Sequence, residues 1–349
     1  MRIIISRADN IGDVVLTLPM ASILKQHYPE AEIIVLARRY VQAVVEAHPA
    51  VDTFIDWESL QTQSDDEIAK ALKALNADII LHVFPLKRIA KAAFTAKIPT
   101  RIGSNRRWYH WLYCNKRVNF SRKSSELHEA QLNLKLLGAL DIKTEYSLAE
   151  IIQFSQLNRP ANLPDTIKNV LSADKFNLII HPGSNGNSIE WPLASFQALL
   201  ATLPKDQFKI IITGSDKENE RLGKALSASC PEAVNTMGQL SLNELILLLG
   251  AADGLVVNST GPLHIASALG IKTLGLFPSH PGKSPKRWGP LGKQAEFFAA
   301  PICASCDPRS PYLSHKGRGG LKGECICMLG ISVNQVKAQL IAWLDTPSH

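Results

Sequence analysis

The fold class of this 349-residue chain is decided by its opening stretch, Ile3-Ile4-Ile5-Ser6-Arg7-Ala8-Asp9-Asn10-Ile11-Gly12-Asp13-Val14. A β-branched run over 3–6 predicts a strand, and residues 7–12 form a polar loop. From 13 to 28 the apolar residues recur at helical spacing. A strand that leads through a short loop into a helix is the first part of a β–α–β unit, so the opening predicts a parallel sheet covered by helices.

The same alternation continues along the chain. It predicts strands at 33–37, 53–56 and 78–83, and helices at 41–47, 67–75 and 128–140. A segment at about 156–174 carries Pro160, Pro164 and several Asn residues, and is the best candidate for a linker. Beyond it the pattern predicts strands at 176–181, 208–213, 254–258 and 273–277, and helices at 193–203, 217–229, 241–250 and 261–269.

We therefore expect an α/β protein with two Rossmann-like domains. The N-terminal one covers 1–160 and the C-terminal one covers 174–331. A C-terminal helix within 332–349 follows, and its packing against the N-terminal domain is one expectation. In doubly wound α/β folds, ligands bind at the carboxyl ends of the strands, so we expect a cleft there.

Composition indicates a well-cored globular protein with an anionic partner. Hydrophobic residues make up 46% of the chain and charged residues 20%, and the net charge is +7. The sequence contains no run of ~18 apolar residues, so we expect no membrane-spanning helix. Asp9 and Asp13 interrupt the N-terminal apolar run, which argues against a signal peptide, so we expect a cytoplasmic protein with reduced thiols.

Four of the six cysteines form the pairs Cys303-x-x-Cys306 and Cys325-x-Cys327. This spacing resembles a zinc site, although Cys-x-Cys is an uncommon half-site for structural zinc. Zinc binding stays open. Four thiolates would leave no open coordination position, so any zinc would be structural and we expect no catalytic metal.

Asp13 follows Gly12 at the start of the first helix. One interpretation is that Asp13 caps this helix. The other is that its carboxylate points into the cleft as a general base. Position alone favours neither, and the two are compatible.

Two loops of the second half suit a phosphate-bearing ligand. In 181–188 the sequence His-Pro-Gly-Ser-Asn-Gly-Asn-Ser offers backbone N–H groups and polar side chains, with a flexible loop as the alternative. In 258–264 Ser259 or Thr260 can cap a helix and Pro262 suits its first turn. His264 lies one turn in, either as part of an anion site at the helix start or as a hydrogen-bonded packing residue. The chain has no P-loop, no Gly-x-Gly-x-x-Gly and no Asp-x-Asp.

At these residues the chain resembles glycosyltransferase family 9, the ADP-heptose:lipopolysaccharide heptosyltransferases. The matching motifs span nearly the whole chain: Gly12 to Pro19, Arg101-Ile102-Gly103, His128-Glu129 with Asn133-Leu134, His181-Pro182-Gly183, Trp191-Pro192, Gly214 with Glu218, and Ser259 to His264. The resemblance implies a GT-B fold, with two Rossmann-like domains, and inversion at the anomeric carbon without a metal or cofactor.

The resemblance also implies roles for single residues. Asp13 would deprotonate an acceptor hydroxyl that attacks the heptose carbon of ADP-heptose, and Glu218 would lie near the ribose. The further donor-binding residues would be Gly12, Ser184, Asn185, Asn187, Ser188, Gly214, Ser259, Thr260, Gly261, His264 and Lys286. Two positions depart from the family. Ile189 stands where a phosphate-binding Lys is usual, and Ser259 where an Asp is common. A compensating cation would come from Lys283, Lys286 or Arg287.

A basic and aromatic stretch over 101–122 fits the acceptor, the lipid A–core lipopolysaccharide with its phosphates and carboxylates. The expected acceptor-binding residues are Arg38, Arg39, Lys87, Arg88, Arg101, Arg106 and Arg107. Such a protein would contact the inner leaflet peripherally. The alternatives are an ordinary solvated basic face, a family member with another nucleotide sugar, and a nonenzymatic protein that binds anionic glycans or nucleic acid. No nucleic-acid motif supports the last.

Overall fold

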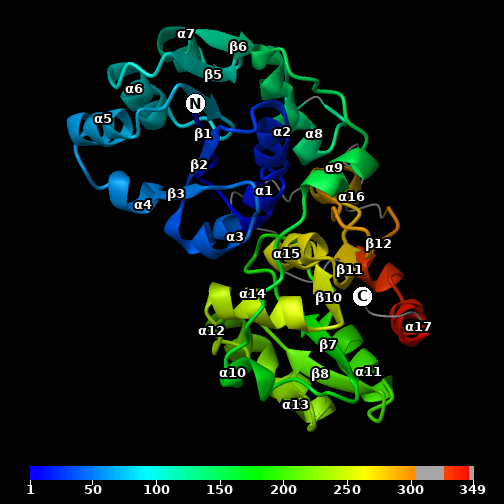
Figure 1. The fold of residues 1–349 in the computed structure, drawn as a ribbon. Coiled ribbons are helices and arrows are strands. Elements are labelled where there is room, and N and C mark those ends of the chain that lie inside the picture. Colours follow the sequence, from blue (N-terminus) through cyan, green and yellow to red (C-terminus); the bar gives the residue numbers. More distant parts are fainter. Residues whose placement is uncertain (124, 303–325, 346–349) are drawn as a thin grey trace. The chain divides into compact units, whose positions relative to one another are not determined.

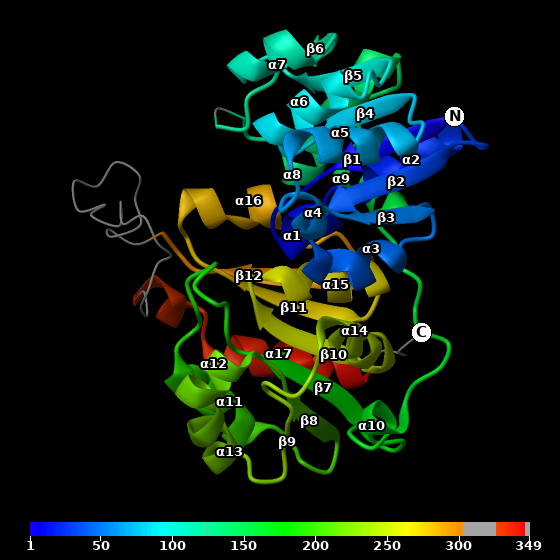
Figure 2. The ribbon, with the colours of Figure 1, turned by 90° about the vertical axis from the view of Figure 1, so that its left-hand side faces the viewer.

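The computed structural model describes residues 1–123, 125–302 and 326–345. The chain divides into two compact units, Met1–Asn158 and Arg159–His349, and each is built on a six-stranded sheet (Figures 1 and 2). Within both sheets every pair of neighbouring strands is parallel. This confirms the predicted α/β fold class with two Rossmann-like sheets.

The sheet of the first unit has the strand order β3-β2-β1-β4-β5-β6. Its strands are β1 (Arg2–Ser6), β2 (Glu32–Ala37), β3 (Thr53–Asp56), β4 (Ile79–His82), β5 (Thr100–Ser104) and β6 (Lys116–Val118). Its helices are α1 (Ile11–Val15), α2 (Pro19–His27), α3 (Gln42–Glu46), α4 (Trp57–Leu60), α5 (Asp65–Ala74), α6 (Lys87–Thr95), α7 (Trp108–Tyr113), α8 (Glu129–Leu134) and α9 (Leu148–Phe154).

The central strand β1 is buried on both faces, which is why Ile3, Ile4 and Ile5 follow one another without alternation. Ile4 packs in a core with residues of α5 and α6. The order of the strands reverses at β1, which pairs with β2 on one side and β4 on the other. The loop after β1 therefore lies at the switch point of the sheet, where ligands of such folds bind.

The helix predicted over 13–28 is in fact two helices. α1 ends at Val15 and α2 begins at Pro19. Proline has no N–H and is favoured at the first position of a helix, so the chain ends one helix and starts another there. The Thr17 hydroxyl donates to the Asp13 carbonyl oxygen at 2.8 Å, which closes the last turn of α1.

The sheet of the second unit has the order β12-β11-β10-β7-β8-β9. Its strands are β7 (Phe176–His181), β8 (Phe208–Ile212), β9 (Val234–Asn235), β10 (Gly254–Asn258), β11 (Lys272–Phe277) and β12 (Ala295–Ala299). Its helices are α10 (Asp165–Lys168), α11 (Leu193–Thr202), α12 (Asp216–Glu218), α13 (Lys224–Ser229), α14 (Leu242–Ala251), α15 (Gly261–Leu269), α16 (Pro285–Trp288) and α17 (Val333–Leu344), with a π-helical turn at Asn219–Gly223.

The C-terminal helix belongs to the second unit. Trp343 of α17 lies in the same hydrophobic core as Phe196 and stacks on Phe176. The Lys272 ammonium donates to the Trp343 carbonyl oxygen at 2.5 Å. Helix α17 therefore completes the core around β7 and β10, and the expected packing of the C-terminal helix against the N-terminal domain stays a prediction.

The predicted linker is partly folded. The division into units falls between Asn158 and Arg159, inside the linker, but Arg159 already donates to the Leu269 carbonyl oxygen at 2.8 Å. Ile167 of α10 is fully buried. Proline and asparagine there mark turns of a segment that packs on the second unit. Over the described ranges, no helix is both long and apolar enough to cross a bilayer.

Candidate functional site

Asp13 lies in the first turn of α1 but does not cap it. The capping position is occupied by Asn10, and Asp13 is the third residue of the helix. Gly12 precedes it inside α1. Of the two interpretations of Asp13, the cap is therefore wrong, because its carboxylate bonds to a side chain and not to the free backbone N–H groups.

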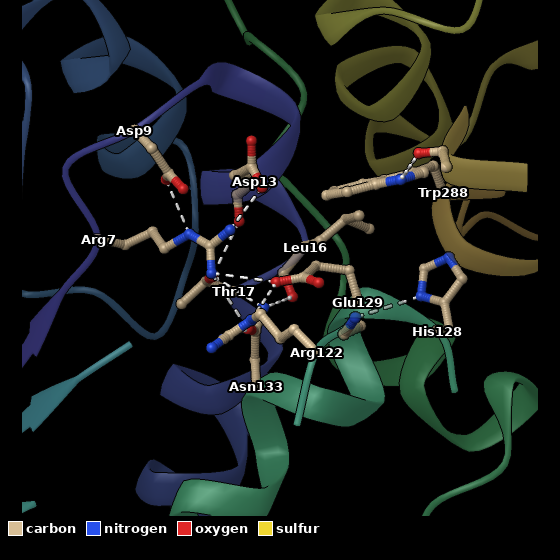
Figure 3. A network of polar contacts seen from close by, with 12 residues as sticks. Arg7, Asp9, Asp13, Leu16, Thr17, Arg122, His128, Glu129, Asn133 and Trp288 are labelled. Atoms are coloured by element: carbon tan, nitrogen blue, oxygen red, sulfur yellow. Dashed lines mark hydrogen bonds and ion pairs between the residues drawn. The ribbon is translucent and has the colours of Figure 1, made fainter. Parts of the chain in front are cut away.

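The partner of Asp13 is Arg7, the first residue after β1 (Figure 3). Arg7 Nη2 donates to Asp13 Oδ1 at 2.5 Å, and Arg7 Nε donates to Asp9 Oδ1 at 2.8 Å. The Arg7 side chain is 3% exposed. One buried guanidinium thus holds both acidic residues of the loop, with the planar fork that suits carboxylates.

Residues of α8, together with Arg122, hold the Arg7 side chain in place. Arg7 Nη1 lies 3.2 Å from both Glu129 Oε1 and Asn133 Oδ1. Arg122 donates to the same two oxygens, at 2.9 and 2.7 Å. These residues were not predicted as site residues from the sequence. The signal that could have found them is the spacing of Glu129 and Asn133, four residues apart on one face of a helix.

Asn133 also ties α8 to the break between α1 and α2. Its Nδ2 donates to the Leu16 carbonyl oxygen and to Thr17 Oγ1, both at 3.0 Å. A helix break leaves carbonyl groups without intrahelical partners, and Asn133 satisfies the one of Leu16. The turn that carries Asp13 is therefore fixed from both sides.

Among the described residues, carboxylates outnumber guanidinium groups in this cluster. Two guanidinium groups, Arg7 and Arg122, face the three carboxylates of Asp9, Asp13 and Glu129. Burial raises the pKa of Asp9 to about 7, against the opposing effect of Arg7 and with a further increase from Asp13. Burial lowers the pKa of Arg7, but Asp9, Asp13 and Glu129 outweigh it and raise that pKa overall.

This arrangement leaves one carboxylate oxygen of Asp13 available to accept a proton. Arg7 holds Oδ1, whereas no partner is found for Oδ2 in the described ranges 1–123, 125–302 and 326–345. The Asp13 side chain is 15% exposed, so it reaches solvent while its orientation is set from behind. A carboxylate positioned in this way can accept a proton from a hydroxyl group.

In the second unit, the loop after β7 is a tight turn. Asn185 and Gly186 have φ values of 49° and 77°, and Asn187 N donates to the Ser184 carbonyl oxygen at 2.9 Å. Two central residues with positive φ, of the type Asn-Gly, are typical of a type I′ turn. The loop therefore contains a defined turn over 184–187.

The backbone amides of this turn are not bare. Ser184 N donates to Glu190 Oε1 at 2.8 Å, and Asn185 N donates to Glu218 Oε1 at 2.9 Å. The expectation that these amides are open to a phosphate is corrected, because two carboxylates of the chain already occupy them. The Ser188 hydroxyl is buried and has no hydrogen-bond partner among the described residues.

Glu218 has a structural role in the described chain. It is buried, and its Oε2 accepts from Ser215 N at 2.8 Å in the capping box of α12. A Cβ atom at Gly183 would lie 1.9 Å from Glu218 Oε1, and one at Gly214 would lie 2.6 Å from Met237 Cε. The loops after β7 and β8 can close around this carboxylate because both positions are glycine.

The helix after β10 begins as predicted. Thr260 is its N-cap residue but makes no side-chain capping bond, Gly261 is the first helical residue, and His264 is buried in the helix. Ser259 N bonds the Leu276 carbonyl oxygen. Asn258, which the sequence analysis did not assign, clamps the neighbouring loop. Its Oδ1 accepts from Trp191 N at 2.9 Å and its Nδ2 donates to the Pro182 carbonyl oxygen at 2.6 Å.

Ile189 does not face a ligand. Its side chain is 2% exposed and packs in the core with Trp191 and Phe196. A cation reaches the same loop from elsewhere: Lys283 Nζ donates to the Asn187 carbonyl oxygen at 2.6 Å. Lys286 lies in α16, a few residues further on, and is exposed.

Six of the seven predicted acceptor residues follow the carboxyl ends of strands. Arg38 and Arg39 follow β2, Lys87 and Arg88 begin α6 after β4, and Arg106 and Arg107 follow β5. Several are ion-paired: Arg38 with Glu58, Arg39 with Asp56 and Arg88 with Asp65.

Arg101 is the exception. It lies near the amino end of β5, where its Nε donates to the Tyr113 carbonyl oxygen at 2.8 Å. It also donates to the Ile98 carbonyl oxygen. The structure thus separates it from the other six and uses it to brace α7.

Of the cysteine quartet, only Cys327 lies in the described part of the chain, where it is buried. Cys303, Cys306 and Cys325 lie outside the described residues. Within 1–123, 125–302 and 326–345, no three His, Cys, Asp or Glu side chains come close enough together to hold a metal ion.

Comparison with known proteins gives a consistent result. The chain is 26% identical to a putative glycosyltransferase of Haemophilus influenzae, over 83% of this chain and 86% of the relative. It is 23% identical to lipopolysaccharide heptosyltransferase 2 of Escherichia coli K12, over 82% and 85%.

Solved structures show the same fold. The E. coli ADP-heptose lps heptosyltransferase II superposes with a TM-score of 0.77 at 20% identity, over 99% of this chain and 98% of that one. E. coli heptosyltransferase WaaC with ADP gives 0.71 at 17%, over 98% and 100%. The fold class is therefore GT-B. The model of glycosyltransferase family 9 (heptosyltransferase) matches residues 66–311, more than half of the chain. The chain is a glycosyltransferase and belongs to glycosyltransferase family 9.

Proposed function

We propose that this protein transfers heptose from ADP-heptose to the inner core of lipopolysaccharide, with inversion and without a metal, and that Asp13 is the general base. The observation that carries the proposal is the anchored carboxylate of Asp13, whose Oδ1 is held by buried Arg7 at 2.5 Å. Family membership and the names of the relatives support the heptosyl transfer.

The chemical step balances as follows. Asp13 Oδ2 accepts the proton of an acceptor hydroxyl, and the hydroxyl oxygen forms a bond to the anomeric carbon of heptose. The bond between that carbon and the diphosphate oxygen breaks, and ADP leaves with the electron pair. Attack opposite the leaving group inverts the anomeric configuration. The structural row of Arg122, Glu129 and Asn133 keeps Arg7, and through it Asp13, in place.

On the donor side, we assign the diphosphate to the start of α15 together with Ser188 and the cation of Lys283. Thr260 leaves the first amides of α15 without a side-chain cap, and a helix start attracts anions. Glu218 and Gly214 lie at the carboxyl end of β8, where a nucleoside would bind in a Rossmann-like domain.

One observation favours a second candidate, a different nucleotide sugar. The amides of Ser184 and Asn185 are occupied by carboxylates, and Ile189 is in the core. The phosphate site expected from the resemblance is thus rearranged.

On the acceptor side, we assign the exposed Arg106 and Arg107 to phosphates or carboxylates of the inner core. Lys87, in the segment after β4, also follows the carboxyl end of a strand. The acceptor carries a lipid, so the protein would work at the inner leaflet as a peripheral protein.

The test is a transfer assay with ADP-heptose, UDP-sugars and a lipid A–core acceptor, read by mass of the product. We expect ADP-heptose alone to be consumed. Asp13→Asn should lower kcat about 10²- to 10⁴-fold while ADP binding is retained, because a positioned general base contributes that much. Full activity of Asp13→Asn would refute the base, and preference for a UDP-sugar would refute the donor.

A further inference from the structure

The apolar side chains of α7 form an exposed face. Trp108, Trp111 and Leu112 are spaced like one face of a helix and are 64%, 60% and 60% exposed. We call these three side chains the α7 face. Helix α7 connects β5 to the edge strand β6 along the chain and lies beside α6 (Figure 1). Three large apolar side chains grouped in this way mark an interaction surface.

The other side of α7 is firmly attached to the unit. His110 is buried, and its Nδ1 lies 2.9 Å from the Ser104 carbonyl oxygen. The Tyr109 hydroxyl donates to the Pro85 carbonyl oxygen at 2.7 Å. A Cβ atom at Gly103 would lie 2.4 Å from His110 Nδ1, so glycine there makes room for the ring. The α7 face is therefore presented by a rigid support.

The polar atom of Trp111 is already satisfied. Its indole N–H donates to the Asn105 carbonyl oxygen at 3.1 Å. A tryptophan whose N–H is bonded can enter an apolar phase without an unmade hydrogen bond. The Arg117 guanidinium lies 4.4 Å from the centre of the Trp111 ring, and the Lys87 ammonium lies 4.9 Å from that of Trp108. Each ring thus has a cation over one of its faces.

The charge around the α7 face has one sign. The 47 residues from Ile79 to Ser125 contain 11 Lys or Arg and no Asp or Glu. The rest of the chain holds the other 27 basic residues and all 31 acidic ones, so its net charge is negative. The basic character of the protein is concentrated in the segment that carries α7.

We propose that the α7 face is a membrane-docking surface that inserts into the interfacial region of a bilayer rich in anionic lipid. Aromatic and leucine side chains partition into this region, and flanking lysines and arginines bind anionic headgroups. Single-stranded nucleic acid fits less well, because one face of each tryptophan ring is covered by a cation and Leu112 offers no stacking surface. This inference deepens the proposed peripheral membrane contact and rests on it.

The test uses the full chain and sedimentation with vesicles, of phosphatidylcholine alone and of phosphatidylcholine with phosphatidylglycerol. We expect binding to the anionic vesicles only, weakened by salt. Leu112→Ala should lower the partition constant about fivefold, from the partial burial of one leucine side chain, and Trp108→Ala with Trp111→Ala at least about tenfold. Leu148→Ala is the matched control, because Leu148 of α9 is an exposed leucine (39%) of the same unit.

Equal vesicle binding by wild type, Leu112→Ala and Leu112→Asp would overturn the proposal. So would binding to a single-stranded oligonucleotide in preference to anionic vesicles. Transfer to a delipidated, water-soluble core acceptor is measured in parallel, and Leu112→Ala should leave it unchanged. Loss of vesicle binding with this transfer intact supports the docking surface. Vesicle binding by a protein that transfers no heptose would refute the proposed function and not the surface.

Discussion

Replacing Arg7 by methionine should destabilise the first unit strongly. Arg7 has partners in Asp9, Asp13, Glu129 and Asn133, but Arg122 also binds the last two, so the loss falls on Asp9 and Asp13. Breaking a buried ion pair by removing one partner costs about 3–5 kcal/mol. Because burial raises the pKa of Asp9 to about 7, this carboxyl is protonated at pH 5, so we expect a loss of about 3 kcal/mol at pH 8 and a smaller loss at pH 5. Typical domains have only about 5–15 kcal/mol of stability.

Hydrogen exchange read by mass spectrometry measures this effect. Peptides of β1 and α8 should exchange faster in Arg7→Met, whereas peptides of β7 serve as an internal reference in the second unit. Lys25→Met is the control, because the pair of Lys25 and Asp52 (2.8 Å) is partly exposed and should contribute at most about 1 kcal/mol. A first unit of Arg7→Met as stable as that of Lys25→Met at pH 8 would refute the argument that Arg7 organises the site.

Three further predictions concern single residues. The pKa of Asp9 is raised in the folded state from 3.8 to about 7, so wild-type stability should fall as the pH rises from about 4 to 7. Asp9→Asn should lack this loss, so the free energy of unfolding in urea should rise for the variant relative to wild type as the pH goes from about 4 to 7. If the two free energies change with pH in parallel, the raised pKa is contradicted. Ile189→Lys should not restore a phosphate site but should destabilise the second unit by several kcal/mol, because the ammonium would enter the core. A stable Ile189→Lys variant that binds ADP more tightly than wild type would contradict this prediction. Asn258→Ala leaves Trp191 N and the Pro182 carbonyl oxygen without their partner and should cost about 2–4 kcal/mol by thermal unfolding; an unchanged Tm would show that Asn258 does not hold the loop.

Much of the fold is local in origin and could be predicted from the sequence. The strands 53–56, 176–181 and 254–258 have the predicted bounds. The last two are buried parallel strands, which appear in a sequence as short runs of apolar residues. Edge elements were missed. The segment over 101–122 is rich in basic and aromatic residues and shows no clear period, so no element was predicted there. It folds into most of β5, α7 and β6 through contacts such as that of the buried His110 with the Ser104 carbonyl oxygen.

Helix ends were less predictable, because side chains far along the chain determine them. The break before Pro19 has a local cause in the missing N–H of proline. Its stabilisation by Asn133, however, depends on a residue more than a hundred positions later. Side-chain partners also decide which amides are available to a ligand. Glu190 accepts from the Ser184 amide and Glu218, 33 positions away, accepts from the Asn185 amide, although the sequence offered both amides to a phosphate.

The sequence by itself determined the strand–loop–helix pattern, the two-fold repetition of the sheet and the position of Asp13 after the first strand, since these follow from periodicity and turn residues. Only the tertiary structure decided what surrounds Asp13. Arg7 meets Glu129 and Asn133 because β1 and α8 pack in one unit, and the helical spacing of Glu129 and Asn133 does not tell which distant residue they contact. It also decided that Ile189 is a core residue and that Arg101 braces α7, because the direction of a side chain depends on what packs against it.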